Sequence, residues 1–247
     1  MRRSVSSARY GKHVESETAE QAGASKTLAG VVLASMRSDI LELKLPPGSK
    51  LPFESLRERY DAGFSPLRES LSRLVVEGLV IGEDQRGFRV APLTVEDFID
   101  LTTLRREIEV MAVTRSVERG GDTWEADLIR ALHHMLLASS PVNRGYPTEW
   151  ARRHKAFHEA LVAACGSPRL LQLRRQLFDH FMRYQRIAPR HVWKNSIRDT
   201  EHKKIVDAAV SRNIDKVQAL VGAHIRVIEE IVDGVEAFQS RNDRRTK

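Results

Sequence analysis

The pattern that most constrains this chain lies between residues 26 and 92, where helical segments precede short β-prone runs. Apolar residues recur at helical spacing from Thr27 onward, until Pro46-Pro47-Gly48 stops the first helix. A second, shorter helix is expected from Phe53 to about Tyr60.

A third helix and a hairpin complete this region. The third helix is expected to begin at Ser65-Pro66, with the serine as cap and the proline at the first helical position, and to run to Glu77-Gly78. Two β-prone runs, 79–81 and 88–90, flank a polar turn that ends in glycine and predict a hairpin. Three helices followed by a two-stranded hairpin predict a winged helix-turn-helix domain over residues 26–92.

Beyond Pro92 the pattern changes to helices only. Amphipathic segments are expected at 94–119, 123–138, 148–165, 168–187, 194–211 and 214–239. Six helices with short connections predict an all-α antiparallel bundle over residues 93–240, so the fold class is mainly α. Residues 1–25 lack periodic apolar positions and are expected to form a flexible arm, and 241–247 a basic tail.

Composition narrows the class of protein. Forty Lys and Arg against 33 Asp and Glu give a net charge of +7, which favours an anionic partner such as nucleic acid. Residues 26–92 hold ten basic and nine acidic side chains, so net charge alone does not locate a nucleic-acid site. The single cysteine, Cys165, excludes an internal disulfide and is expected in the core. Without an apolar run that predicts a membrane span or a secretory signal, the protein is expected in the cytoplasm.

The predicted winged helix suggests where DNA would bind. A helix-turn-helix places its second helix in the major groove, with the first residues of that helix facing base edges. A long cation and a glycine at the wing tip suit close approach to a minor groove. The candidate DNA contacts are Ser65, Arg68, Arg73, Arg86 and Gly87.

Arg68 is the sharpest of these candidates. It lies one turn into the predicted recognition helix, opposite the apolar positions, where its guanidinium is able to bind a guanine edge or a phosphate. The alternative is an exposed arginine paired with Glu69 or Glu77. Winged helices also occur as protein-interaction modules, so the fold alone leaves the function open.

Four histidines in the predicted bundle have the placement of metal ligands. His154 and His158 are four residues apart and share one helical face, while His202 and His224 lie on the last two predicted helices. Imidazoles on facing helices of a bundle are a common way to hold a divalent transition metal. The alternative is that these histidines are solvated or hydrogen-bonded within the protein.

The N-terminal motifs resemble those of the GntR family of bacterial transcription regulators. The stretch LPPGSKLPFESLRERYDAGFSPLRESLSRLVVEGLV, followed by RGFRV, is similar to the winged helix of that family in order and spacing over residues 30–92. The family commonly has Val-Ser-Arg-Thr before the proline, and this chain has Ala62, Gly63, Phe64 and Ser65 there. Two common DNA-contacting groups are therefore missing, and the operator is expected to differ from the usual one.

The C-terminal motifs resemble the FCD branch of the same family, whose effector domain is FadR-like. HKAFHEALVAACGSPRL and DTEHKKIVDAAVSRNIDKVQALVGAHI are similar to the D-x-x-F-H, E-H-x-x-I-x-x-A and A-x-x-x-H motifs of that branch. The resemblance implies an all-helical domain in which an Asp and three His hold zinc or a similar ion beneath an effector cavity. His158, His202 and His224 match the three histidines, and His154 stands in place of the Asp. A more nitrogen-rich site favours zinc, nickel or copper over harder ions, and draws a carboxylate effector more strongly.

The resemblance also suggests an effector site. Arg105 matches a family arginine that reaches into the cavity and is a candidate carboxylate partner, although an ion pair on the surface with Glu109 is equally compatible with its position. Tyr184 and Arg186 are further candidates for lining the cavity. The segments RGGDTWEAD and RHKAFHEALVAACGS, with the His-for-Asp exchange, are most similar to repressors of this branch that respond to glutarate-type dicarboxylates.

The competing interpretation is a metal-dependent enzyme of small organic acids with a vestigial winged helix. His154 and His158 form the histidine pair of a zincin helix, but Lys155 stands where a metalloprotease needs its glutamate base. A metal-buffering or scaffold protein is a third class. Arg68 and the wing favour a regulator, because an enzyme or scaffold has no use for them. The sequence therefore predicts a repressor and not an enzyme, released from DNA by a small carboxylate bound at the metal. The family resemblance implies that the repressor is a homodimer that reads an inverted-repeat operator.

Overall fold

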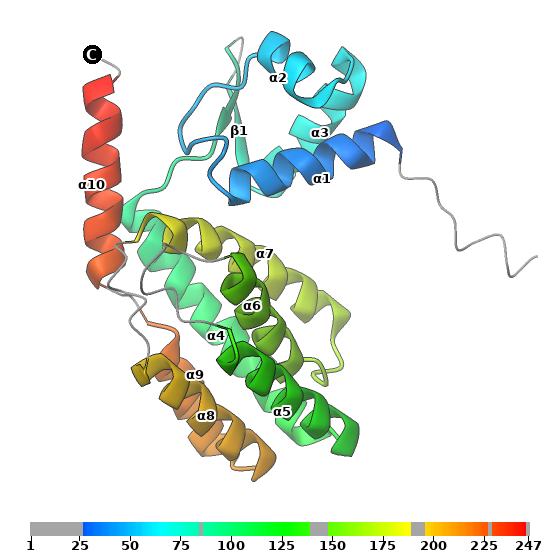
Figure 1. The fold of residues 1–247 in the computed structure, drawn as a ribbon, viewed down its shortest axis with the longest axis vertical. Helices are drawn as coiled ribbons and strands as arrows, with labels where there is room; N and C mark the ends of the chain where they lie inside the picture. The colour runs from blue at the N-terminus through cyan, green and yellow to red at the C-terminus, as the bar shows by residue number, and fades with distance from the viewer. Residues whose placement is uncertain (1–26, 84–85, 139–147, 189–195, 227–228, 246–247) are drawn as a thin grey trace, which may run out of the picture.

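The computed structural model describes residues 27–83, 86–138, 148–188, 196–226 and 229–245. The expected flexible arm, 1–25, lies outside these residues. Figure 1 shows a small N-terminal unit above a bundle of longer helices, with the last helix standing at one side of both. The mainly helical fold class is confirmed.

The N-terminal unit is a winged helix. Its elements are α1 (Leu28–Leu41), α2 (Phe53–Tyr60), α3 (Phe64–Val76), β1 (Val80–Glu83) and β2 (Gly87–Val90). Thr27 caps α1 by accepting a hydrogen bond from the Gly30 amide at 3.2 Å. The core is formed by apolar side chains that every element contributes, among them Met36, Ile40, Leu56, Leu67, Leu71, Leu74 and Val90.

The start of α3 differs from the prediction. Gly63 is the cap residue and Phe64 the first helical residue, so Ser65 and Pro66 lie within the first turn. Proline is tolerated there because the first amides of a helix have no partner inside the helix. As a result Ser65 does not cap the helix, and its exposed side chain lies on the first turn.

The hairpin forms the wing as expected. Its strands are antiparallel, with Val80 opposite Val90 and Glu83 opposite Gly87. Gly87 has a φ of 90°, a conformation that side-chain-bearing residues rarely adopt, which explains the glycine at this position. The wing is also tied to the turn after α1, where the Gly48 amide donates to the Val90 carbonyl at 3.0 Å.

The C-terminal unit is an antiparallel helical bundle, as predicted. Its helices are α4 (Val95–Arg119), α5 (Asp122–Leu136), α6 (Thr148–Leu161), α7 (Pro168–Ile187), α8 (Ser196–Val210), α9 (Ile214–His224) and α10 (Glu229–Arg245). The side chains of Thr94 and Ser167 cap α4 and α7. The main core lies between α4, α5, α6, α8 and α9 and includes Cys165, which is fully buried with a free thiol as expected.

The last predicted helix, 214–239, is two helices in the structure. At Ile225 the backbone leaves the helical region, with φ −95° and ψ 85°. The break separates two packing surfaces, because Ile225 belongs to the main core whereas Ile231 and Val235 pack on a second cluster near the linker. β-Branched residues after His224 weaken the helix at this point. His224 therefore ends α9, and α10 continues to Arg245 through most of the expected tail.

The second cluster joins the two units. Leu93 of the linker packs with Phe98 and Leu101 of α4, Phe181 and Tyr184 of α7, and Ile231 and Val235 of α10. None of the described helices combines the length and the apolar character needed to span a bilayer.

Candidate metal centre and nucleic-acid interface

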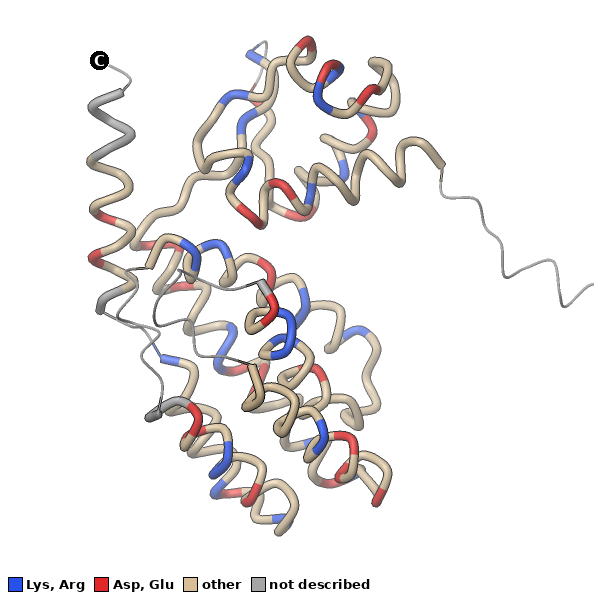
Figure 2. Tube along the Cα trace, viewed as in Figure 1, with Lys and Arg blue, Asp and Glu red and all other residues tan. Residues whose placement is uncertain are grey.

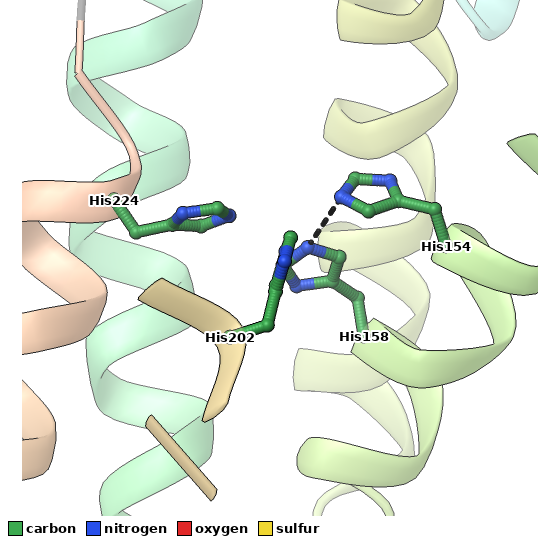
Figure 3. Close-up of side chains that lie close together, drawn as sticks. All are labelled: His154, His158, His202 and His224. Carbon is green, nitrogen blue, oxygen red and sulfur yellow. Dashed lines mark hydrogen bonds between the residues drawn. The ribbon is translucent and has the colours of Figure 1, made fainter. Parts of the chain in front are cut away.

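The four predicted histidines converge at one point in the bundle. Figure 3 shows His154 and His158 extending from α6 toward His202 of α8 and His224 of α9. One ring nitrogen from each lies within 4.8 Å of the others, and the Nε2 atoms of His154 and His158 are 3.1 Å apart. The structure thus brings together residues separated by up to 70 positions in the chain.

The surroundings of the cluster keep His158 neutral and hold the ring of His154 in place. Burial, then the neighbouring rings of His154, His224 and His202, holds the pKa of His158 well below its usual range. His154 stacks on Trp150 with ring centroids 4.6 Å apart. Neutral imidazole is the form that binds metal, so the lowered pKa leaves His158 competent as a ligand.

Glu201 orients one of the four rings. Nδ1 of His224 donates to its carboxylate at 2.9 Å, which leaves the other ring nitrogen of His224 as the acceptor. Burial opposes ionisation of Glu201, but the hydrogen bond from His224 and the nearby Arg226 outweigh it, so the pKa of Glu201 is lowered. A carboxylate that fixes the tautomer of a ligand histidine is typical of metal centres. The Glu201-His202 pair of the motif carries this signal, although Glu201 was not among the predicted site residues.

The donor set fits a divalent transition metal. Ligand nitrogens of a tetrahedral zinc site lie roughly 3.3 Å apart, so the cluster spacing needs only small side-chain rotations to match. Four imidazoles and no carboxylate among the candidate ligands suit a borderline-soft ion better than calcium or magnesium. The histidine cluster is therefore a candidate metal site.

The predicted recognition helix presents its polar face to solvent. Leu67, Leu71 and Leu74 are fully buried against the other helices, while Ser65, Arg68 and Arg73 are exposed. The alternative partners of Arg68 are engaged elsewhere, because Glu69 pairs with Arg73 at 2.6 Å and Glu77 with Arg37. Arg68 forms no ion pair within the described part of the chain.

The wing brings two more candidates to the surface. Arg86 and Gly87 are exposed at the hairpin tip. Arg89 faces the other way: its Nε donates to Glu83 at 2.9 Å and its Nη1 to the Gly48 carbonyl at 2.5 Å. Figure 2 shows basic and acidic residues interleaved along the described chain, as the charge counts predict. Position on the fold, rather than a concentrated basic face, therefore identifies the candidate contacts.

Comparison with protein families identifies the family of the winged helix and of the helical bundle. Residues 28–90 match the model of the bacterial regulatory proteins of the gntR family, and residues 100–227 match the FCD domain. The chain belongs to the GntR family and carries an FCD domain. It is thus a DNA-binding transcription regulator, and the prediction that it is not an enzyme is confirmed by membership of this family.

Two relatives cover most of the chain. The HTH-type transcriptional repressor GlaR of Escherichia coli K12 is 36% identical over 195 residues, 77% of this chain and 89% of its own length. The HTH-type transcriptional regulator BphR of Paraburkholderia xenovorans LB400 is 32% identical over 81% of this chain and 83% of its own. Both are named as regulators, in agreement with the family.

Solved structures show the same fold. Escherichia coli McbR/YncC has a TM-score of 0.68 at 18% identity and matches 86% of this chain and 99% of its own. A GntR regulator of Rhodococcus sp. RHA1 has a TM-score of 0.65 at 20% identity, with 85% and 97% covered. These similarities extend over both the winged helix and the FCD domain.

Arg105, Glu109 and Arg174 form a buried charged group next to the histidines. Arg105 lies 3.6 Å from Glu109, as one interpretation expected, but the pair is buried and not on the surface. Glu109 also accepts from Arg174 Nε at 2.8 Å, and Arg174 donates to the His158 carbonyl at 3.0 Å. The guanidinium of Arg105 lies over the rings of Phe178 and Phe181, 4.9 and 4.3 Å from their centroids. Arg174 was not among the predicted site residues, since arginine on a helix is usually exposed.

The other two effector candidates lie away from the histidines. The Tyr184 hydroxyl donates to Asp97 and accepts from the Thr94 amide at 3.3 Å, which ties α7 to the linker. Burial, together with the hydrogen bond to Asp97, raises the pKa of Tyr184. Arg186 lines a groove between α1, α6 and α7 together with Arg37 and Lys155. The structure thus places Arg105, but not Tyr184 or Arg186, beside the histidine cluster.

Proposed function

We propose that this GntR regulator is a homodimeric repressor that a small organic acid, a dicarboxylate, releases from its operator. The acid binds at a divalent metal held by His154, His158, His202 and His224, with zinc as the expected ion and nickel as the alternative. GlaR, which is named as a repressor, supports the direction of regulation. The protein acts on DNA in the cytoplasm.

The buried charges carry this proposal. Among the fully buried charged side chains next to the histidines, Arg105 and Arg174 face a single glutamate, Glu109. Glu201, which holds His224, is only partly buried. A divalent ion would add positive charge to this buried group. A dianion would balance buried positive charge better than a neutral ligand or a monoanion. A bound metal would supply Lewis-acid attraction for one carboxylate, and Arg105 would bind the other.

The domains and the dimer follow from the same proposal. Residues 26–92 bind DNA, residues 93–240 bind metal and effector, and the linker around Pro92 and Leu93 joins them. In a homodimer, two copies of α3 read the halves of an inverted repeat, with Ser65, Arg68 and Arg73 at the major groove and Arg86 and Gly87 at the minor groove. Tyr184 and Arg186 serve the contact between domains instead of lining the effector site.

Titration of the metal-loaded protein with succinate, glutarate and adipate tests the effector class. At least one of these acids should bind about 10- to 150-fold more tightly than butyrate, because the second carboxylate gains a charge-assisted hydrogen bond. Calorimetry reports both affinities directly. Arg105→Ala should abolish the difference, whereas Arg130→Ala, on the exposed face of α5, should retain it. Equal affinity for dicarboxylates and butyrate would contradict the proposed effector.

Contacts between the domains give the effector a path to α3. Lys155, which lies between two of the proposed metal ligands on α6, donates to Asp179 of α7 at 2.8 Å. Asp179 also lies 3.8 Å from Arg37 of α1, and Arg37 pairs with Glu77 at the end of α3. The Glu77 carbonyl accepts from His180 of α7 at 2.7 Å. A movement of α6 or α7 would therefore act on the C-terminal end of the recognition helix.

Asp179→Asn tests this path. The substitution keeps the shape of the side chain but removes the charge shared by Lys155 and Arg37, so the link between α6 and α1 weakens. Metal content and acid affinity should stay near those of the original protein, while the loss of operator affinity caused by the acid should shrink by about 2- to 30-fold. Fluorescence anisotropy of labelled operator measures the ratio of the operator affinities without and with the acid. Asp127→Asn, which removes an exposed pair with Arg130, is the control. An unchanged ratio in Asp179→Asn would exclude Asp179 from the path.

A further inference from the structure

Phe64 is an exposed aromatic residue at the start of α3, the end of this helix that is proposed to enter the major groove. It is the first residue of that helix, and its side chain is 53% exposed, in contrast to the buried leucines of the same helix. Phe64 and Arg68 are four residues apart and share one helical face. The ring is thus placed beside the residue proposed to read a base.

Two other aromatic rings fix the position of Phe64. Its ring stacks on Phe53 of α2, with centroids 4.5 Å apart and planes at 28°. Phe53 in turn meets Phe88 of the wing edge-on at 6.1 Å. These contacts connect the recognition helix, α2 and β2 while leaving about half of the Phe64 side chain open to solvent. An apolar side chain that is both exposed and held in place is suited to contact a partner.

The chemistry of the major groove limits what that partner is. Base edges there present hydrogen-bond donors and acceptors, and the only apolar group is the C5-methyl of thymine. A phenylalanine ring offers no conventional hydrogen bond but packs well against a methyl group. We propose that Phe64 reads the methyl group of a thymine in each operator half-site, next to the base contacted by Arg68. This inference rests on the proposed placement of α3 in the major groove.

Replacing thymine by deoxyuridine tests the contact, because it removes the methyl group and preserves base pairing. The operator is first obtained by selection from random duplex DNA, and each thymine is then replaced in both half-sites together. At one thymine position, present once in each half-site, this replacement should lower operator affinity by about fourfold per half-site. This factor corresponds to the loss of one buried methyl group. In Phe64→Ala the two operators should bind with equal affinity.

The comparison within each variant separates base reading from folding. If Phe64→Ala loosens the wing, the affinities for the thymine operator and for the deoxyuridine operator fall together. Only the ratio of these two affinities reports the methyl contact. Phe64→Leu should retain a reduced ratio, since leucine still offers an apolar surface. Val76→Ala, at the exposed far end of α3, should retain the full ratio. The proposal is overturned if a selected operator responds to Arg68→Ala but no thymine position responds to deoxyuridine, or if Phe64→Ala keeps the original ratio. Failure to select any operator would instead contradict the proposed function itself.

Discussion

Replacing His202 and His224 together by alanine is expected to strip the protein of its metal. The double variant keeps His154 and His158, which lie on one helix and supply only half of the proposed ligand set. Structural zinc sites with four ligands bind with roughly 10–16 kcal/mol, so loss of two ligands should cost about half of that. Binding weakened by roughly 5–8 kcal/mol does not survive purification or dialysis.

Plasma mass spectrometry of the purified proteins measures this effect. The original protein should hold about one equivalent of transition metal per chain, as expected for a single four-ligand site, and the double variant close to none. His133 and His134, which are exposed on α5, give a matched control in which two other histidines become alanine without loss of metal. The metal site would be disproved by equal metal content in the original protein and in the His202→Ala, His224→Ala variant.

Arg68→Ala is expected to produce the largest loss of operator affinity for a single substitution. Arg68 is exposed on the side of α3 proposed to face the major groove and has no ion-pair partner among the described residues, so its guanidinium is available for DNA. Loss of a base contact costs about 1–3 kcal/mol per half-site, or roughly 2–6 kcal/mol for a dimer that uses it twice. The affinity of the dimer should therefore fall by at least about 30-fold.

Salt dependence shows which part of the DNA Arg68 contacts. If Arg68 reads a base, the Arg68→Ala protein should discriminate less between operators that differ at the contacted base pair. The slope of log affinity against log salt concentration should then hardly change. If it contacts a phosphate, affinity should fall for all sequences and the slope should decrease by about one. Arg130→Ala, remote from α3, controls for net charge. Unchanged operator affinity in Arg68→Ala would remove this residue from the interface.

Local patterns predicted most of the fold. Apolar periodicity, caps and the Pro46-Pro47-Gly48 stop located the three helices and the wing. The ends of α2 (Phe53–Tyr60) and α7 (Pro168–Ile187) agree with the prediction. The exceptions depend on packing between distant segments. The helix expected over 214–239 breaks because its two halves belong to different clusters, a choice that apolar spacing alone does not reveal.

The four histidines of the candidate metal site were predictable from the sequence, but the residues that hydrogen-bond to them were not. The spacing of His154 and His158 and the family motifs identified four residues that the structure brings within 4.8 Å. The roles of Glu201 and Arg174 depend on side chains meeting across 23 and 65 positions, which no local pattern encodes. Tyr184 was predicted to line the effector cavity, yet its hydroxyl hydrogen-bonds to Thr94 at the linker and to Asp97. Side-chain direction on a buried helix follows from tertiary packing, so it needs the structure.

The most direct test of the account is selection from random duplex DNA, followed by release of the selected operator with succinate, glutarate or adipate. We expect the metal-loaded protein to enrich a short inverted repeat at low salt, where phosphate contacts are strongest. One of the acids should then release this operator from the original protein but not from the His202→Ala, His224→Ala variant. A protein that enriches no sequence, or an acid that releases both proteins equally, would contradict the central claim that a metal-bound acid controls DNA binding.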